Sequence, residues 1–225
     1  MGEQAPSLAK FFMTGRVAQV PKGGIVLRGD DENPDIYFVS KGFIKVYSIN
    51  DEGEEYLHII YKQGDIFPLI WAFKDRQRRV FYEALISSVL WKISKTKFLD
   101  HIKSNSGDVT YSLVEQLAEQ FSVYADRLDN LQYRAAAERV VYRLLFLASR
   151  FGQKIGNSII IDAPITHKLI AQSINLTRES VSREIEILTK AGLIDTQDGK
   201  ILIKDVKKLS EEFSEPVSLD LWGLQ

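Results

Sequence analysis

The segment from Thr166 to Gly192 constrains the fold of this chain more than any other part of its 225 residues. Apolar residues recur at helical spacing after Thr166 and again after Thr177. A threonine hydroxyl can accept a backbone N–H that has no partner within a helix, so both residues are good helix starts. Gly192 stands where a glycine commonly follows the last helical residue. The segment therefore predicts two short helices joined by a tight turn.

The second predicted helix has one apolar side and one charged side. Long hydrogen-bonding side chains gather at its N-terminal end, at Arg178, Glu179 and Arg183. Such a helix end can enter the major groove of DNA and contact base edges. An ordinary helical hairpin with a solvated charged face would show the same periodicity, so the assignment depends on the residues after Gly192.

A β-hairpin is predicted directly after the two helices. Residues 193–197 and 200–204 flank Asp198-Gly199, and Asp-Gly is a strong signal for a two-residue hairpin turn. Two helices followed by a small hairpin form a winged helix. The hairpin of such a module commonly lies along the phosphate backbone, where the ammonium group of Lys200 would be useful.

The sequence Thr-Arg-Glu-Ser-Val-Ser-Arg, residues 177 to 183, resembles the recognition-helix motif of the CRP/FNR family of bacterial transcription regulators. The resemblance extends from about residue 15 to about residue 210. It implies that Arg178 and Arg183 donate to guanine N7 and O6, and that Glu179 accepts from a cytosine amino group. It also implies backbone phosphate contacts by Thr166, His167, Thr177 and Ser180.

The resemblance and the residue patterns together predict an α+β fold. Short β-branched and aromatic runs with Gly and Asp between them indicate an antiparallel sandwich or barrel in the N-terminal half. The family pairs a jelly-roll-like β-roll with a winged helix through a long helix. The expected boundaries are 1–107 for the β-roll, 108–135 for the dimerisation helix and hinge, 136–214 for the winged helix-turn-helix domain and 215–225 for a tail.

The region where the family binds a cyclic nucleotide departs from the cyclic-AMP pattern. Asp65 replaces the usual glutamate after Gly64, and the bulky Trp71 follows shortly afterwards. Arg78 or Arg79 could take the place of the phosphate-binding arginine, but no Ser or Thr follows either one. On the long helix, our register puts Tyr124 where cyclic-AMP receptors carry a hydroxyl pair that touches adenine.

These departures make cyclic AMP a doubtful ligand. The aromatic side chains indicate a pocket that is filled, a pocket for a flatter and more apolar ligand, or simply core. A possible effector pocket would be formed by Gly64, Asp65, Trp71, Arg78, Arg79 and Tyr124.

A long helix is predicted from Asp108, with an apolar seam close to the repeat of a coiled coil. The family uses this helix as a two-fold interface, so the resemblance implies a parallel homodimer. Alternatively, the seam packs only on its own β-roll. The seam consists of Leu113, Leu117, Phe121, Tyr124, Leu128 and Leu131.

Composition limits the remaining classes of protein. With no cysteine, the chain has no disulfide and no thiolate site for zinc or an iron–sulfur cluster. Its three histidines lack metal-ligand spacing, so we expect no metal site and no enzyme activity, and haem at His58 is not favoured. No apolar run approaches the roughly 18 residues that span a bilayer, and no signal peptide is recognised, which predicts a cytoplasmic protein. The net charge of −1 excludes a broadly basic nucleic-acid coat.

The predicted function is that of a homodimeric, sequence-specific transcription regulator. Its partners would be double-stranded DNA with a pseudo-palindromic site, a second copy of the chain, and RNA polymerase. An effector in the β-roll would switch it. Three alternatives stay open: an effector-independent regulator with a filled pocket, a cyclic-nucleotide-responsive regulator, and a β-roll signalling module that does not bind DNA.

Overall fold

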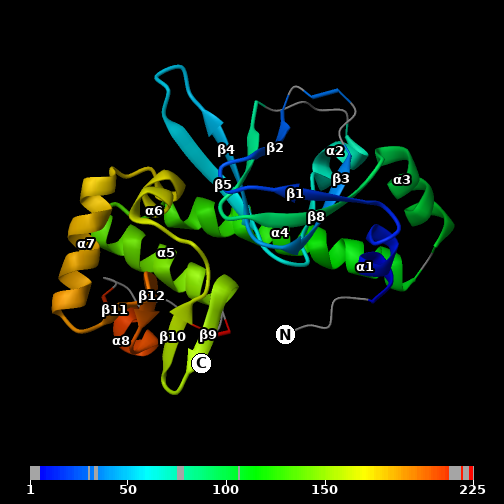
Figure 1. Cartoon of the computed structure of the whole chain (residues 1–225). Coiled ribbons are helices and arrows are strands. Elements are labelled where there is room, and N and C mark those ends of the chain that lie inside the picture. The colour runs from blue at the N-terminus through cyan, green and yellow to red at the C-terminus, as the bar shows by residue number, and fades with distance from the viewer. Residues whose placement is uncertain are drawn as a thin grey trace. The chain divides into compact units, whose positions relative to one another are not determined.

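The computed structural model describes residues 6–29, 31–32, 35–74, 79–105, 107–212, 219 and 223–224. Its internal contacts divide the chain into two compact units, residues 1–124 and 125–225. Figure 1 shows the order of the elements along the chain. No helix among the described residues is both long and apolar enough to cross a membrane.

Unit 1 contains two antiparallel four-stranded sheets, in the orders β1-β8-β3-β6 and β2-β7-β4-β5. At the β3–β4 turn, Gly42 has φ +100°, and a Cβ there would collide with Ser88. Glycine is the residue that tolerates both conditions. The strands are β1 (Arg16–Val20), β2 (Ile25–Arg28), β3 (Ile36–Lys41), β4 (Ile44–Ile49), β5 (Glu55–Tyr61), β6 (Ile66–Phe67), β7 (Phe81–Ala84) and β8 (Ser88–Ile93).

Helices cover part of this β-structure and close its core. The helices of unit 1 are α1 (Pro6–Phe12), α2 (Leu69–Phe73), α3 (Lys95–Ser104) and the first part of α4 (Asp108–Asn130). Phe12 and Phe98 are fully buried, and their ring centroids are 5.9 Å apart. Val109 and Leu113 from the start of α4 join the same cluster, so this end of α4 is fixed to the β-structure by apolar burial.

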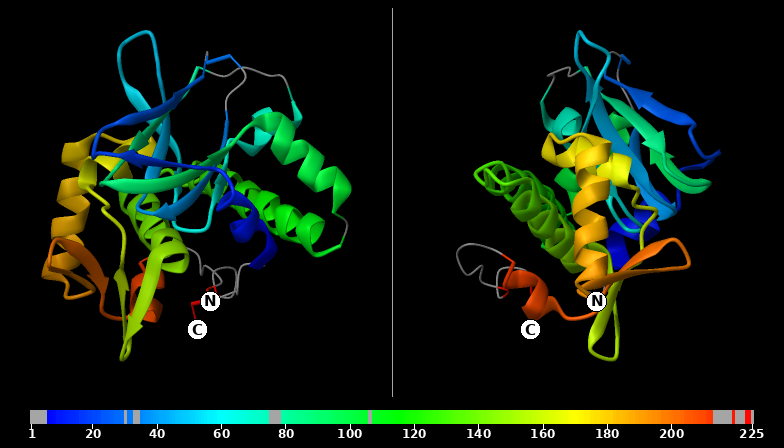
Figure 2. Two further views of the ribbon diagram at one scale, coloured as in Figure 1. Left: turned by 45° about the vertical axis from the view of Figure 1, so that its right-hand side comes forward. Right: turned by 90° about the vertical axis from the view of Figure 1, so that its left-hand side faces the viewer.

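Unit 2 is a helical domain with a four-stranded antiparallel sheet, ordered β11-β12-β10-β9. Figure 2 shows the β11–β12 hairpin following α7. Asp198 and Gly199 both have positive φ, as a tight hairpin turn requires. The elements are α5 (Ala136–Phe151), β9 (Gly152–Ile155), β10 (Ser158–Ile161), α6 (His167–Ile174), α7 (Arg178–Lys190), β11 (Ile194–Gln197), β12 (Lys200–Ile203) and α8 (Val206–Ser210).

The predicted fold class is confirmed: antiparallel β-structure, a long helix from Asp108 and a helix-turn-helix with a wing. The apolar and aromatic runs at residues 25–27, 36–39, 42–49 and 56–61 predict four strands, and the structure has β2 to β5 at these places. Strands β1, β6, β7 and β8 and helices α1 to α3 were not predicted. Gly152 ends α5 as its C-cap, and the same residue begins β9, which pairs with β10.

Candidate nucleic-acid interface and ligand cavity

Helix α6 is held at both ends by short polar contacts. The Thr166 hydroxyl accepts a hydrogen bond from the Leu169 backbone N–H at 3.2 Å. Asn175 ends the helix in the left-handed conformation (φ 54°), and its N–H donates to the Ala171 carbonyl. Asparagine tolerates that conformation better than most residues. The turn between α6 and α7 is therefore fixed by local sequence.

Helix α7 begins in the same way. The Thr177 hydroxyl accepts from the Ser180 N–H at 3.1 Å and lies 2.9 Å from the Ser180 hydroxyl. Val181, Ile185 and Leu188 form the buried face of α7, on the side away from solvent. Capping and burial together fix the rotation of α7, and so decide which side chains point outward.

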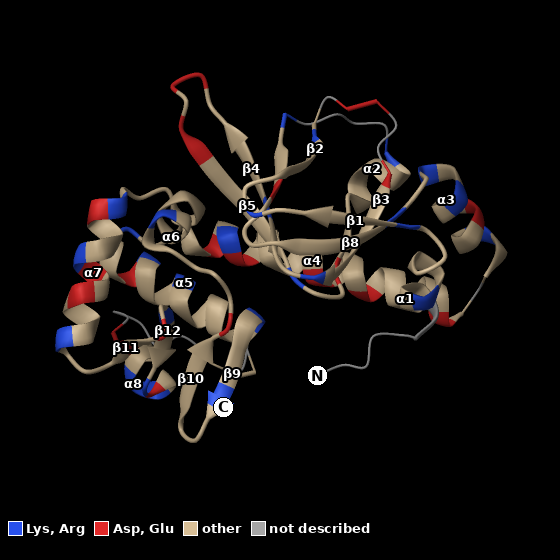
Figure 3. Cartoon of the chain, viewed as in Figure 1, with Lys and Arg blue, Asp and Glu red and all other residues tan. Residues whose placement is uncertain are grey.

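The charged groups at the N-terminal end of α7 are exposed. Arg178, Glu179 and Arg183 are all exposed residues. Within the described part of the chain, none of the three forms an ion pair or a side-chain hydrogen bond. Figure 3 shows blue and red segments alternating along this helix. These guanidinium and carboxylate groups are free to meet an external partner, as base contacts require.

His167 connects the two helices. Its Nδ1 lies 2.9 Å from the Ser182 hydroxyl of α7, and the residue is half-buried. Burial, and then the positive charge of Arg178, lowers the pKa of His167 below its usual value. Near pH 7 the ring is therefore neutral in the free protein, and it is not the fixed cation that a simple phosphate contact would use. Ser182 was not predicted as a partner of His167.

Lys200 already has a carboxylate partner inside unit 2. Its ammonium pairs with Asp162 at 2.5 Å, and Asp162 also accepts from the Gln153 amide at 2.6 Å. On the neighbouring strand, Asp195 pairs with Lys204 at 3.1 Å. The expected phosphate contact by Lys200 would have to share or replace the bond to Asp162. The spacing of residues in the sequence does not predict that Asp162 pairs with Lys200.

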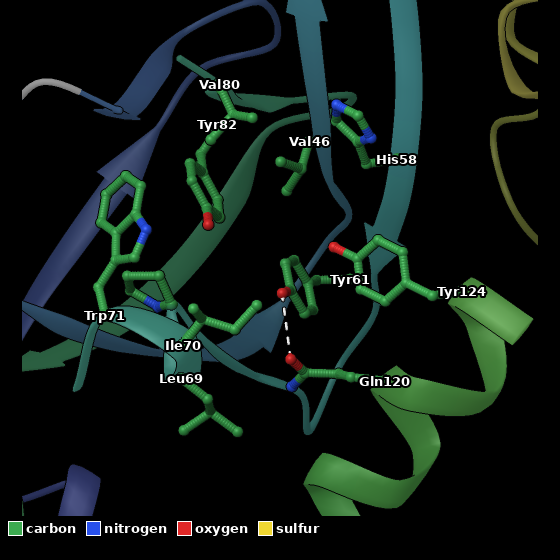
Figure 4. Close-up of a pocket in the computed structure, with 11 residues that line it drawn as sticks. Val46, His58, Tyr61, Leu69, Ile70, Trp71, Val80, Tyr82, Gln120 and Tyr124 are labelled. Carbon is green, nitrogen blue, oxygen red and sulfur yellow. Dashed lines mark hydrogen bonds between the residues drawn. The ribbon is translucent and has the colours of Figure 1, made fainter. Parts of the chain in front are cut away.

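Unit 1 contains a cavity of only about 20 Å³, enough for about one water molecule. Figure 4 shows side chains from the β2-β7-β4-β5 sheet, α2 and α4 converging on it. The cavity is lined by Val46, His58, Tyr61, Pro68, Leu69, Ile70, Trp71, Val80, Tyr82, Gln120 and Tyr124.

Stacked aromatic rings fill the space around this cavity. The Phe67 ring stacks on Tyr61 at 5.0 Å, on Tyr82 at 5.3 Å and on Tyr37 at 5.3 Å between centroids. Trp71 packs edge-on against Tyr82 at 5.8 Å. Aromatic pairs at these separations are mutually stabilising. The pocket is thus occupied by the protein's own side chains.

The polar atoms at the cavity are hydrogen-bonded to one another. The Tyr61 hydroxyl donates to Gln120 Oε1 at 3.3 Å, and the Gln120 amide donates to the Ile66 carbonyl at 2.9 Å. His58 Nε2 lies 2.9 Å from the Ser48 hydroxyl. The described residues that line the cavity include no Lys or Arg, so none of them supplies the positive charge that a cyclic phosphate would need.

The expected effector residues separate into two groups. Trp71 and Tyr124 line the cavity, whereas Gly64 and Asp65 do not. The Asp65 carboxylate accepts from the Lys62 N–H at 2.9 Å, and the Gly64 carbonyl accepts from the Gln116 amide at 3.3 Å. Both belong to the β5–β6 turn, which the local bond to Asp65 closes and the bond from Gln116 ties to α4. Arg79 is exposed outside the lining, and Arg78 lies outside the described residues.

The residues of the predicted seam on α4 differ in their exposure. Leu113 was placed in the dimer interface, but it is 5% exposed within the core of unit 1. Tyr124 and Leu131 are half-buried. Two apolar rows run along this helix, one buried and one exposed. The predicted seam combined residues of both rows. The exposed row consists of Tyr111, Val114, Leu117, Phe121 and Leu128.

Two family patterns match the chain, one on each side of α4. The cyclic nucleotide-binding domain matches residues 17–105, and the Crp-like helix-turn-helix domain matches residues 138–212. The chain belongs to the CRP/FNR family. Both parts of the fold and the recognition motif agree with that membership.

Curated relatives share this two-domain extent. The global nitrogen regulator of Synechococcus elongatus is 22% identical over 200 residues, which cover 88% of this chain and 90% of the relative. The cAMP-activated global transcriptional regulator CRP of Salmonella typhimurium is 24% identical, covering 88% and 94%. A CooA mutant structure from Carboxydothermus hydrogenoformans has a TM-score of 0.75 at 21% identity, covering 90% and 89%.

Proposed function

We propose that this CRP/FNR family member is a sequence-specific DNA-binding transcription regulator that inserts the N-terminal end of α7 into the major groove. One observation carries the proposal: Arg178, Glu179 and Arg183 are exposed and without an internal partner among the described residues, on a helix whose start is fixed by the cap at Thr177. Arginine pairs with guanine and glutamate with cytosine in that groove. Thr166, Thr177 and Ser180 would then contact phosphates.

Selection from a pool of random duplexes tests this proposal. The purified chain should enrich one half-site sequence, and its affinity for that duplex should fall steeply as salt rises, because phosphate contacts release counterions. Enrichment of no sequence, together with equal affinity for all duplexes, would leave only non-specific binding. Absence of any salt-dependent binding would instead support a signalling module that does not bind DNA.

We further propose a homodimer formed through the exposed row on α4. Phe121 is 75% exposed and Leu128 is 67% exposed, and large apolar side chains repeated along one helix face need a partner surface. A two-fold dimer would place two α7 helices on half-sites about 34 Å apart, so we expect a pseudo-palindromic operator. Sedimentation analysis should show a dimer for the native chain and a monomer for Phe121→Glu. Ile49→Glu, an exposed site on β4, should remain dimeric.

We propose that an effector bound in unit 1 regulates DNA binding. An effector in unit 1 would act by favouring one of two states. Among the described residues, no Lys or Arg lines the cavity, so we propose an uncharged effector and not cyclic AMP. Thermal-shift measurements against cyclic nucleotides, haem and neutral aromatic metabolites test this, because a ligand of the native state raises Tm. We also propose that the protein acts with RNA polymerase, in the cytoplasm.

A second candidate has its own support. The stacked rings of Tyr61, Phe67 and Tyr82 leave a cavity the size of one water, which favours a regulator that needs no small molecule. In that case the purified chain should bind its selected duplex at full affinity without any additive. A metabolite extract that changes this affinity several-fold would favour the effector-switched version.

A further inference from the structure

The C-terminal half of α7 carries an isolated apolar side chain on its exposed side. Ile187 is 52% exposed, and it lies four residues after Arg183, one helical turn further along the same face. The buried residues Val181, Ile185 and Leu188 define the opposite face. Ile187 is therefore outside the buried face of α7, and lies on the side that carries the base-reading group of Arg183.

The polar neighbours of Ile187 are engaged with the helix itself. The Lys190 ammonium pairs with the Glu186 carboxylate at 2.6 Å, and the Thr189 hydroxyl donates to the Ile185 carbonyl at 2.7 Å. The pairing with Lys190 also lowers the pKa of Glu186. The charges of Glu186 and Lys190 thus balance each other, and the alkyl group of Ile187 is the apolar feature that this turn of α7 offers to a partner.

Isoleucine at this position does not serve the stability of the helix. A β-branched side chain loses rotamer freedom in a helix and is a poorer helix former than Ala or Leu. Exposed, it also gains little from burial. In the major groove, the apolar group that the bases present is the C5-methyl of thymine. An exposed alkyl group on a groove-binding helix matches that methyl and cannot hydrogen-bond to phosphate.

We propose that Ile187 is a further specificity-determining residue, which contacts the C5-methyl group of a thymine next to the base pair read by Arg183. The proposal rests on the DNA-binding function proposed above. It adds to that function a thymine preference set by an apolar contact, at a position that the charged residues of α7 do not reach.

Replacing thymine by uracil tests the contact, because the exchange removes one methyl group and keeps every hydrogen-bonding group. The probe is the duplex selected from the random pool, with each dT of one half-site changed to dU in turn. One of these exchanges should weaken binding of the native chain about fourfold, the equilibrium value of roughly one buried methyl group. The Ile187→Ala chain should bind the dT and dU duplexes equally.

Ile155 provides a matched control. It is also an isoleucine of unit 2 with 52% exposure, on β9 and not on α7. The Ile155→Ala chain should keep the fourfold preference for dT. If Ile187→Ala keeps the same dT preference at every position, or if the selected half-site has no dU-sensitive thymine, the assignment of Ile187 is wrong while the DNA-binding function stands. If no duplex is selected at all, the function itself fails.

Discussion

The exposed end of α7 and the cavity of unit 1 differ in whether their polar groups already have partners within the chain. On α7, three charged side chains have no internal partner among the described residues. At the cavity, Tyr61 and Gln120 are bonded to each other and the rings of Phe67 and Tyr82 are stacked. Unpaired exposed charges cost little in water, whereas buried polar groups must be satisfied. The end of α7 therefore has polar groups available for a ligand, whereas the hydrogen bonds and ring contacts at the cavity are already made within the chain.

The largest effect is expected where the cavity is filled. Phe67→Ala removes a fully buried ring that stacks with Tyr37, Tyr61 and Tyr82. The free energy of unfolding should fall by about 3–5 kcal/mol, measured by urea denaturation. Ile70→Ala, at an exposed position three residues after Phe67, should lower the free energy of unfolding far less. Equal losses for both variants would show that the stacked rings are not what stabilises unit 1.

Arg183→Ala should have the opposite pattern, with a loss of binding and little change in stability. We expect DNA affinity to fall by about 1–3 kcal/mol, with discrimination relaxed at one base pair. The free energy of unfolding should change by less than about 0.5 kcal/mol, because the side chain is exposed. Competition binding with substituted duplexes measures the first effect, and urea denaturation the second. Arg183→Lys should regain some affinity without the discrimination, since lysine lacks the forked donor. Uniform weakening on all sequences would make Arg183 a phosphate contact only.

Tyr61→Phe should give a smaller change at the cavity. The variant removes the hydroxyl that donates to Gln120 but keeps the stacked ring. Stability should fall by about 0.5–1.5 kcal/mol, the net value of one hydrogen bond, again by urea denaturation. If thermal shift then reveals a ligand that the native chain ignores, the hydroxyl is part of what keeps the cavity closed.

The smallest effect concerns pH at His167. In the free protein its pKa is lowered by burial and by Arg178, so the ring is neutral near pH 7. Phosphates nearby favour the protonated ring, so DNA binding takes up a proton and affinity should rise as pH falls. From about pH 7.5 to about pH 6 we expect a gain of about threefold. His167→Gln should remove this dependence, and His101→Gln should keep it. A pH-independent native chain would contradict a phosphate near His167.

Local signals explain why the winged helix was predictable and the ligand region was not. The caps at Thr166 and Thr177 and the Asp198-Gly199 turn act within a few residues of where they stand. The partner of Lys200, in contrast, is Asp162, which the sequence separates from it by a whole helix-turn-helix. No local rule connects two such residues.

The filled cavity depends on contacts between separate strands. Tyr61, Phe67 and Tyr82 come from three strands, and β7, which carries Tyr82, was not predicted at all. Phe67 belongs to one sheet and Tyr61 and Tyr82 to the other, so their stacking results from the packing of the two sheets and not from spacing along the chain. On α4 the error had another cause: two apolar rows lie side by side, and a single periodicity cannot separate Leu113, which is buried, from Phe121, which is exposed.

Helix α4 contains 23 residues, which corresponds to a rod about 34 Å long at 1.5 Å per residue. Val109 and Leu113 pack the first turns of α4 into the core of unit 1. The side-chain amides of Gln116 and Gln120 donate hydrogen bonds to the β5–β6 turn and to strand β6. Ten residues of α4 follow Gln120, a stretch of about 15 Å, so a tilt of about 5° at Gln120 would move the end of the helix by about 1.3 Å. A small rearrangement beneath those two glutamines would therefore reach the C-terminal end of α4 as a displacement about as long as one covalent bond.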